Sequence, residues 1–325
     1  MRVSHYLEFE GVVSGGIRES VRHQRQMLEE QGVSYTTEPS LDVDVVHFNL
    51  MGPRSAYCAK RAGSRDIPVV IHSHVTAEDF GDSFRLTNLL ARPLRPYLER
   101  VYGLGDLLVC PSEYNQSIIG AYADIETRVL TNGVDTEKLE NHESLRAEYL
   151  DRYDLTPPVV FMVGHVIKRK GLETFVETAR AMPDLDFAWF GPVSRSLKGR
   201  PTKRLIDSAP DNCTFTGYVD DIRGAFGAGD IFFFPTHEEN EGIALLEAMV
   251  TGTSVVVRDI PTFDWLEDGT HCLKTDDDFE ALLRRLQADD DLRARLGENA
   301  ATLGSEYALS TVADQLTDCY AEVGA

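Results

Sequence analysis

Two glutamates in one stretch of the chain have the type and spacing to bind a polyhydroxylated ligand. The stretch DIFFFPTHEENEGIALLEAMVTG, residues 230–252, holds Glu239 and, after seven intervening residues, Glu247. A carboxylate accepts hydrogen bonds on both oxygens, so two of them beside a helix N-terminus could hold a sugar or a ribose. Spacing alone supports a second interpretation equally well, in which Glu239 and Glu241 complement a helix dipole and Glu247 is a solvated helix residue.

The elements that must position these glutamates can be predicted from the apolar pattern. The run Ile231 to Phe234 predicts a strand buried on both faces. A helix is predicted from Gly242 to Gly252, with Ile243, Leu246 and Val250 on its apolar face. Its first turn would offer unpaired N–H groups at Gly242, Ile243 and Ala244 to an anion or a hydroxyl.

The whole string ENEGIALLEAM, with VVVRDIP after it, resembles the E-x7-E signature of family-4 glycosyltransferases. It is most similar to the subgroup that glycosylates lipids such as diacylglycerol. The resemblance implies a retaining enzyme with the α/β GT-B fold, in which two Rossmann-like doubly wound parallel-sheet domains face a cleft. It also implies that Glu239 holds the donor sugar and Glu247 the ribose. The other donor contacts implied in this stretch are Asn240, Glu241, Gly242, Ile243 and Ala244.

A basic loop follows the predicted strand VVFMVG and suits a diphosphate. It places Lys168, Arg169 and Lys170 at the carboxyl end of a strand, where open α/β sheets bind ligands. A solvated charge run is the alternative. The loop also resembles the G-R-x4-KG element of the same family. Gly164, Lys170 and Gly171 match it, and Arg169 matches its RKG variant. His165 stands where arginine is usual, and a histidine carries a full positive charge only when it is protonated.

Further site residues are implied by shorter strings. FTGYVDD resembles the family segment beside the nucleotide base, which makes Tyr218 and Val219 base-site candidates. Between the first predicted strand and helix, Gly15 and Gly16 permit close backbone approach to a ligand, although a plain turn is the commoner reason for such a pair. In the resembling family, a glycine loop at this place borders the donor phosphates and the acceptor.

The string PVVIHSHVTAEDF carries two histidines at the end of a predicted strand. His72 and His74 share one face, so they could ligate a metal or join a buried polar network. A metal would need a third ligand, for which Glu78 or Asp79 would have to fold back, and we therefore expect no metal site. HVTAEDF resembles the histidine-bearing loop of lipid-directed glycosyltransferases, which implies that His74 borders the reacting sugar and that His72 is structural.

Composition limits the class of protein. The 325 residues are enough for two domains. The net charge of −21 disfavours a nucleic-acid partner and is explained by a solvated acidic surface suited to a high-salt cytosol. No apolar run approaches the ~20 residues of a membrane span, and MRVSHYLEF lacks a signal-peptide pattern, so we expect a cytoplasmic protein. Five scattered cysteines without a CxxC motif indicate neither disulfides nor zinc.

Two segments of the first half are basic and free of acids, residues 54–65 and 84–98. Their arginines, interleaved with apolar residues, are typical of ordinary surface helices. They also suit peripheral contact with the anionic inner face of a membrane. The residues concerned include Arg54, Arg61, Arg92 and Arg95.

We expect residues 1–150 to form the acceptor domain and 156–305 the nucleotide-sugar domain, with a final helix over 306–324 crossing back to the first. The predicted activity is metal-independent transfer of a hexose from a nucleotide diphosphate sugar, with no further cofactor, to a hydroxyl on a lipid or glycan acceptor. Lys170 and Arg169 would neutralise the leaving diphosphate. Two alternatives stay open: a sugar-nucleotide epimerase of the same fold, and a non-catalytic protein that binds nucleotide sugars.

Overall fold

The computed structural model describes the backbone of residues 1–76, 87–193 and 200–325, with all their side chains except those of 87–93, 200 and 201. The described chain divides into two compact units. The first unit comprises Met1–Val134 and Tyr307–Ala325, and the second comprises Asp135–Glu306.

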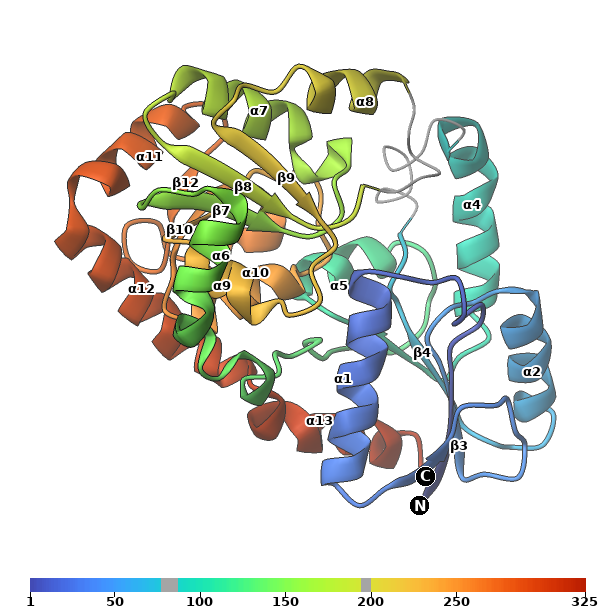
Figure 1. The fold of residues 1–325 in the computed structure, drawn as a ribbon. Coiled ribbons are helices and arrows are strands. Elements are labelled where there is room, and N and C mark those ends of the chain that lie inside the picture. Colours follow the sequence, from blue (N-terminus) through green and yellow to red (C-terminus); the bar gives the residue numbers. More distant parts are fainter. Residues whose placement is uncertain (77–86, 194–199) are drawn as a thin grey trace. The chain divides into compact units, whose positions relative to one another are not determined.

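The first unit is built on a parallel sheet of six strands in the order β2-β1-β3-β4-β5-β6. Its central strands are buried along their whole length because helices cover both faces. Figure 1 shows α1 and α13, which pack together on one face, while α2, α4 and α5 pack on the other. The elements are β1 Arg2–Tyr6, α1 Gly16–Glu30, β2 Ser34–Thr36, β3 Val45–Phe48, α2 Pro53–Gly63, β4 Val69–His72, α4 Thr87–Tyr102, β5 Leu107–Cys110, α5 Glu113–Ile119, β6 Thr127–Val129 and α13 Leu309–Glu322.

The second unit repeats this plan with the strand order β12-β11-β10-β7-β8-β9, again all parallel. Buried aromatic rings fill its core, with Phe175 stacked on Phe233 and set edge-on to Trp189. The elements are α6 Arg146–Tyr153, β7 Val159–Val163, α7 Leu172–Ala181, β8 Asp186–Phe190, α8 Arg200–Asp207, β9 Cys213–Gly217, α9 Arg223–Ala228, β10 Ile231–Phe234, α10 Ile243–Val250, β11 Ser254–Arg258, β12 Leu273–Thr275, α11 Phe279–Ala288 and α12 Asp290–Gly304. Two doubly wound parallel sheets confirm the predicted α/β fold class.

The boundary between the units lies earlier than expected. Residues 135–150, which we assigned to the first domain, belong to the second unit. Arg146 donates to Asp230 Oδ1 at 2.9 Å, and the Tyr149 hydroxyl donates to the Asp221 carbonyl at 2.6 Å. These contacts, to residues more than 70 positions away, fix α6 in the second unit.

The last helix, α13, packs on the sheet of the first unit. Leu309, Val312 and Leu316 are buried in the same apolar cluster as residues of β1, β3, β4, β5 and α1. A parallel bridge joins Val134 to Ala308, where the chain returns to this unit. Among the described residues, no helix is long and apolar enough to cross a membrane.

Candidate functional site

The strand-turn-helix stretch that holds both glutamates folds as β10, a turn, and α10. Gly242 precedes the helix at φ 99°, a left-handed conformation that favours glycine, and the helical residues begin at Ile243. The predicted apolar face was wrong: Leu245 to Met249 are all buried, whereas Ile243 and Val250 are only partly so. The helix is therefore embedded on most of its circumference, and a one-sided pattern does not describe it.

Glu247 lies within this embedded part of the helix. Its exposed fraction is 8%, and that of Glu241 is 4%. The alternative in which Glu247 is an ordinary solvated helix residue is therefore wrong. Burying a carboxylate is costly unless it is compensated, which makes both positions unlike dipole-complementing surface acids.

The basic loop and the turn after β10 are fastened to each other. The Arg169 carbonyl accepts from the His237 amide at 2.8 Å and from the Thr236 hydroxyl at 3.2 Å. Gly171, at φ 81°, allows this approach, because a Cβ there would collide with the backbone of Pro235. A glycine is thus required at the point where the two loops meet.

This contact brings Lys170 onto Glu239. The ammonium and the carboxylate form an ion pair whose side chains are 15% and 13% exposed. Lys170 Nζ also lies 4.9 Å from the centre of the Phe234 ring, a cation–π arrangement. Thr262 fixes the other side of the turn by donating to the Glu239 carbonyl at 2.8 Å. Lys170 and Glu239, which the sequence predicted separately, therefore form a single ion pair that is largely shielded from solvent.

The electrostatics keep Glu239 ionised. Burial, the largest single influence, acts to raise the pKa of Glu239. The charges of Lys170 and Arg169, with hydrogen bonds from Lys170 and from the Asn240 backbone, outweigh it and hold the pKa below its usual value. Arg169 is itself held at this turn, since its guanidinium donates to the Glu238 carbonyl.

His165 does not replace the charge of an arginine. Burial, and then the neighbouring charge of Lys170, lower the pKa of His165 below its usual value. The imidazole is therefore neutral at pH 7 in this structure. The residue before it, Gly164, has φ 136° and accepts a hydrogen bond from Trp189 Nε1 at 2.9 Å, which fixes the start of the loop.

The base-site candidates follow β9 and differ in exposure. Tyr218 is 74% exposed, whereas Val219 is buried. Only the tyrosine ring is thus available to stack on a flat ligand, and Val219 packs inside the unit.

In the first unit, the two loop glycines have different requirements. Gly15 has φ 72° and caps α1, so a side chain there would be strained. At Gly16, a Cβ would meet no atom within 4 Å. Backbone conformation therefore explains a glycine at Gly15 and does not explain one at Gly16.

His72 and His74 belong to a buried polar network. Their rings stack with centres 4.4 Å apart, and His74 Nε2 hydrogen-bonds to Asn49 Oδ1 at 2.9 Å. Gln24 Nε2 donates to His72 Nδ1 at 3.1 Å. Burial lowers the pKa of His74 to about 3, so its imidazole is neutral. Of the two uses that the sequence allowed for this pair, the network is the one observed.

The network contains two histidines that the sequence analysis missed. His5 on β1 lies opposite His47 on β3, and His47 stacks on His72 of β4 with ring centres 5.8 Å apart. His47 Nδ1 also hydrogen-bonds to the Tyr320 hydroxyl of α13 at 2.8 Å. The signal was present, since each of these histidines interrupts an apolar strand, but only the strand order β1-β3-β4 brings them together.

The described residues hold no group of three or more His, Cys, Asp or Glu side chains that could bind a metal. Glu78 and Asp79, considered as third ligands, lie outside the described residues.

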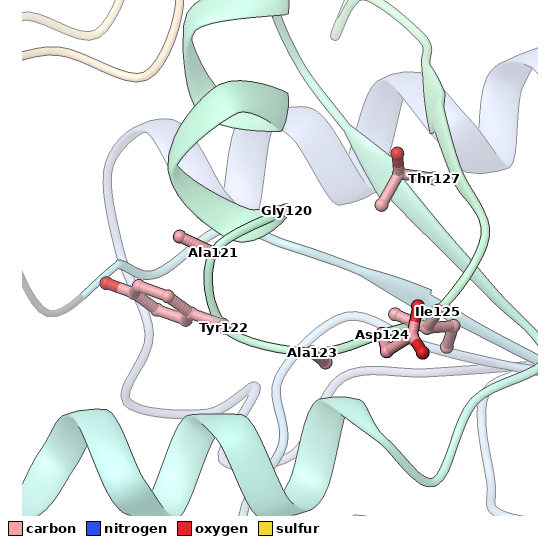
Figure 2. A pocket seen from close by; sticks show the side chains of 7 residues that line it. All are labelled: Gly120, Ala121, Tyr122, Ala123, Asp124, Ile125 and Thr127. Carbon is pink, nitrogen blue, oxygen red and sulfur yellow. The ribbon is translucent and has the colours of Figure 1, made fainter.

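A shallow hollow of about 290 Å³ lies elsewhere in the first unit, at the turn between α5 and β6 (Figure 2). Its lining residues come from one short stretch, 120–127, and include none of the residues discussed above. We assign it no role.

Comparison with known proteins identifies the family. A model described as Glycosyltransferase Family 4 matches residues 15–138, and one described as Glycosyl transferases group 1 matches residues 157–288. The chain is 32% identical to the processive diacylglycerol alpha-glucosyltransferase of Acholeplasma laidlawii, over 99% of this chain and 98% of that protein. It is 24% identical to the alpha-galactosylglucosyldiacylglycerol synthase of Streptococcus pneumoniae, over 91% and 81% of the two chains.

Solved structures agree on the fold. The crystal structure of Anabaena Alr3699/HepE in complex with UDP-glucose matches with a TM-score of 0.79 at 17% identity, over 99% of this chain and 100% of that one. Sucrose-phosphate synthase from Thermosynechococcus elongatus matches with a TM-score of 0.79 at 15% identity, over 99% of both chains. The chain therefore belongs to the family-4 glycosyltransferases and is a glycosyltransferase of the GT-B fold.

Proposed function

We propose that this glycosyltransferase moves a hexose from a nucleotide diphosphate sugar to the hydroxyl of a lipid acceptor, with retention of the anomeric configuration. The observation that carries the proposal is the shielded pair of Lys170 and Glu239 beside the start of α10. The full-length similarity to a diacylglycerol glucosyltransferase supports a lipid acceptor.

The second unit binds the donor in this proposal. Lys170 and Arg169 hold the diphosphate, and the first N–H groups of α10, at Gly242, Ile243 and Ala244, add the positive end of a helix dipole. Because His165 is neutral, it contributes a hydrogen bond and the two neighbouring cations supply the charge. Gly164 and the Asn240–Glu241 turn complete the phosphate and sugar contacts, and the exposed ring of Tyr218 borders the base.

Glu239 and Glu247 have different tasks. Glu239 is ionised, so it accepts hydrogen bonds from the donor sugar. Its negative charge also stabilises the positive charge that develops on the sugar in the transition state. Glu247 accepts from the ribose. Lys170 then serves both its carboxylate partner and the leaving diphosphate, which makes departure of the diphosphate independent of a metal.

The first unit binds the acceptor, with Gly15 and Gly16 in the loop beside it. His74 is too weak a base at neutral pH to remove a proton, since burial lowers its pKa to about 3. Its role is to hydrogen-bond and orient, and the leaving phosphate receives the proton of the acceptor hydroxyl.

Peripheral contact with an anionic membrane, at the cytoplasmic face, would give access to such an acceptor. Arg54 and Arg61 are exposed on α2, and Arg95 is exposed on α4. Each lies over a tyrosine ring, at 5.5, 5.9 and 5.0 Å respectively. Arg54 and Arg95 also form exposed ion pairs with Glu38 and Glu99. Lipid phosphates would compete with these carboxylates for the guanidinium groups.

Labelled nucleotide sugars incubated with the protein and 1,2-dioctanoylglycerol, with and without EDTA, test the proposal. We expect one donor to give a labelled glycolipid at the same rate in both conditions. An epimerised nucleotide sugar without glycolipid would contradict the transferase reaction. Loss of activity in EDTA that zinc or manganese restores would contradict the metal-independent role of Lys170 and Arg169.

A further inference from the structure

A second cavity in the first unit, of about 380 Å³, opens beside His74. Its size lies within the range of about 300–1,000 Å³ that is usual for small-molecule sites. Most of its lining is apolar, and the described lining side chains include none that is charged. The residues are Phe9, Asn49, Leu50, Met51, Gly52, Pro53, His72, His74, Val75, Leu94, Tyr97, Leu98 and Tyr102.

The two tyrosines of α4 contribute rings to this wall. The Tyr97 hydroxyl donates to the Met51 carbonyl at 2.7 Å, and the Tyr102 hydroxyl donates to the Val75 carbonyl at 2.7 Å. Because both hydroxyls are satisfied by the backbone, the lining between them offers hydrocarbon and ring carbon. Such a wall favours an apolar occupant over a sugar, whose hydroxyls would lose their hydrogen bonds to water.

The polar atoms of the cavity belong to Asn49, His72 and His74. The His72 ring accepts from Gln24 through Nδ1, so its proton is on Nε2. Nε2 is buried and has no hydrogen-bond partner among the described residues. A buried N–H without a partner is costly, and the oxygen of a ligand would satisfy it. The lining thus combines an unsatisfied donor with a hydrocarbon wall, which matches an amphiphile with a hydroxyl group.

Phe9 gives the cavity an exposed aromatic margin. It lies at φ 63°, a region that a bulky residue rarely adopts, and 55% of it is exposed. An exposed ring held in a strained conformation is more often found at ligand sites than on ordinary surface.

We propose that this cavity binds the hydrocarbon part of the acceptor, the acyl chain nearest the reacting hydroxyl, with that hydroxyl placed at His72 and His74. The inference rests on the proposed function. It adds a determinant of acceptor specificity, because diacylglycerols with longer acyl chains fill the cavity and are preferred over those with shorter chains. A phosphate or nucleotide is disfavoured, because none of the described lining side chains carries a positive charge.

The test compares Leu94→Trp with Leu104→Trp. Both leucines are partly buried and pack against the same core cluster, but only Leu94 lines the cavity. We expect Leu94→Trp to raise the KM for 1,2-dioctanoylglycerol on the order of tenfold, the equivalent of about two displaced CH₂ groups. Its KM for 1,2-dibutyrylglycerol and for the donor should change less than about twofold. Leu104→Trp should leave the ratio of the two acceptor KM values unchanged.

Thermal unfolding shows whether each variant is folded. If Leu94→Trp does not fold, Leu94→Ala is tested in its place, and we expect a smaller rise in the KM for 1,2-dioctanoylglycerol. Equal effects of Leu94→Trp on both acceptors, or none, would overturn the inference. If the wild type makes no glycolipid at all, the proposed function fails. Equilibrium dialysis with labelled dioctanoylglycerol then tests whether the cavity binds an acyl chain. We expect the wild type to bind this lipid more tightly than Leu94→Trp does, and equal binding by both proteins would overturn the inference.

Discussion

His74 and Glu239 occupy comparable places in the two units, each following a buried parallel strand, β4 or β10, at its carboxyl end. Their surroundings differ. Among the described residues, His74 hydrogen-bonds to Asn49 and stacks on His72, whose neutral imidazole continues to those of His47 and His5. Glu239 is surrounded by cations, Lys170 and Arg169.

The comparison shows that the loop after a buried parallel strand can place its polar side chain among neutral imidazoles in one unit and among cations in the other. In the first unit, burial suppresses protonation of the histidines. In the second, the cost of burying a carboxylate is offset by a lysine that another loop delivers. Neutral surroundings suit a lipid hydroxyl, and a cluster of charges suits a diphosphate and a developing sugar cation. Four experiments test this contrast.

The largest effect is expected when the charge of the second unit is removed. Glu239→Gln keeps the size of the side chain but loses the negative charge that stabilises the developing cation. We expect kcat to fall on the order of 10²-fold or more, if the lost stabilisation approaches ~3 kcal/mol. Glu238→Gln is the matched control, since its backbone carbonyl still accepts from Arg169, and it should retain activity. Steady-state kinetics with both variants measures this. Equal activity of Glu239→Gln and wild type would remove the carboxylate from the mechanism.

Acid should destabilise the first unit more than the second. Burial lowers the pKa of His5 to about 4 and that of His74 to about 3, and the pKa values of His47 and His72 also lie well below the usual 6.5. The unfolded chain therefore binds protons below pH 6.5 that the native state does not, and stability falls as pH falls. The loss at pH 5.5 is about 1.4 kcal/mol per histidine.

Both tryptophans, Trp189 and Trp265, lie in the second unit, so their fluorescence follows that unit alone. Hydrogen exchange of peptides from the first unit reports on the opening of that unit. Between pH 7.5 and 5.5, we expect the free energy of opening in the first unit to drop by several kcal/mol, and His47→Gln to reduce that drop by about 1.4 kcal/mol. Equal acid sensitivity of the two units would show that the histidines are not held neutral.

Glu247→Gln should act on donor binding more than on the chemical step. Contacts to the ribose are nearly equal in the ground and transition states, so we expect a several-fold rise in the KM of the donor with a smaller change in kcat. The buried position of Glu247 also predicts a lower melting temperature. A fall in kcat as large as that of Glu239→Gln would mean that the two acids share one task.

The smallest effect is expected at the membrane. Each basic side chain near an anionic surface contributes roughly 1 kcal/mol and is screened by salt. Neutralising Arg54, Arg61, Arg92 and Arg95 together should weaken flotation with anionic vesicles, and raising the salt should weaken flotation of the wild type. Equal flotation of variant and wild type would leave these arginines as ordinary surface residues.

Much of the fold follows from local sequence, because strands buried on both faces are continuous apolar runs. The sequence did not predict the short edge strand β2, since one exposed and two partly buried residues form no apolar run. The boundary at Val134 was also missed, because it depends on where α6 packs.

The site was only partly predictable for the same reason. The motifs identify Lys170 and Glu239 separately, but their ion pair joins residues 69 positions apart. It exists because Gly171 lets two loops meet at Pro235. Likewise, His5 and His47 join His72 only through the order of the strands, which no local pattern encodes.

The central claim is that this enzyme, assisted by Glu239, transfers a hexose to a lipid hydroxyl with retention of the anomeric configuration. The most direct test is the anomeric configuration of the glycolipid that the wild type makes from an α-linked nucleotide sugar and dioctanoylglycerol, read from the anomeric proton by NMR. The account predicts an α-linked product. A β-linked product, or release of free sugar without glycolipid, would contradict it.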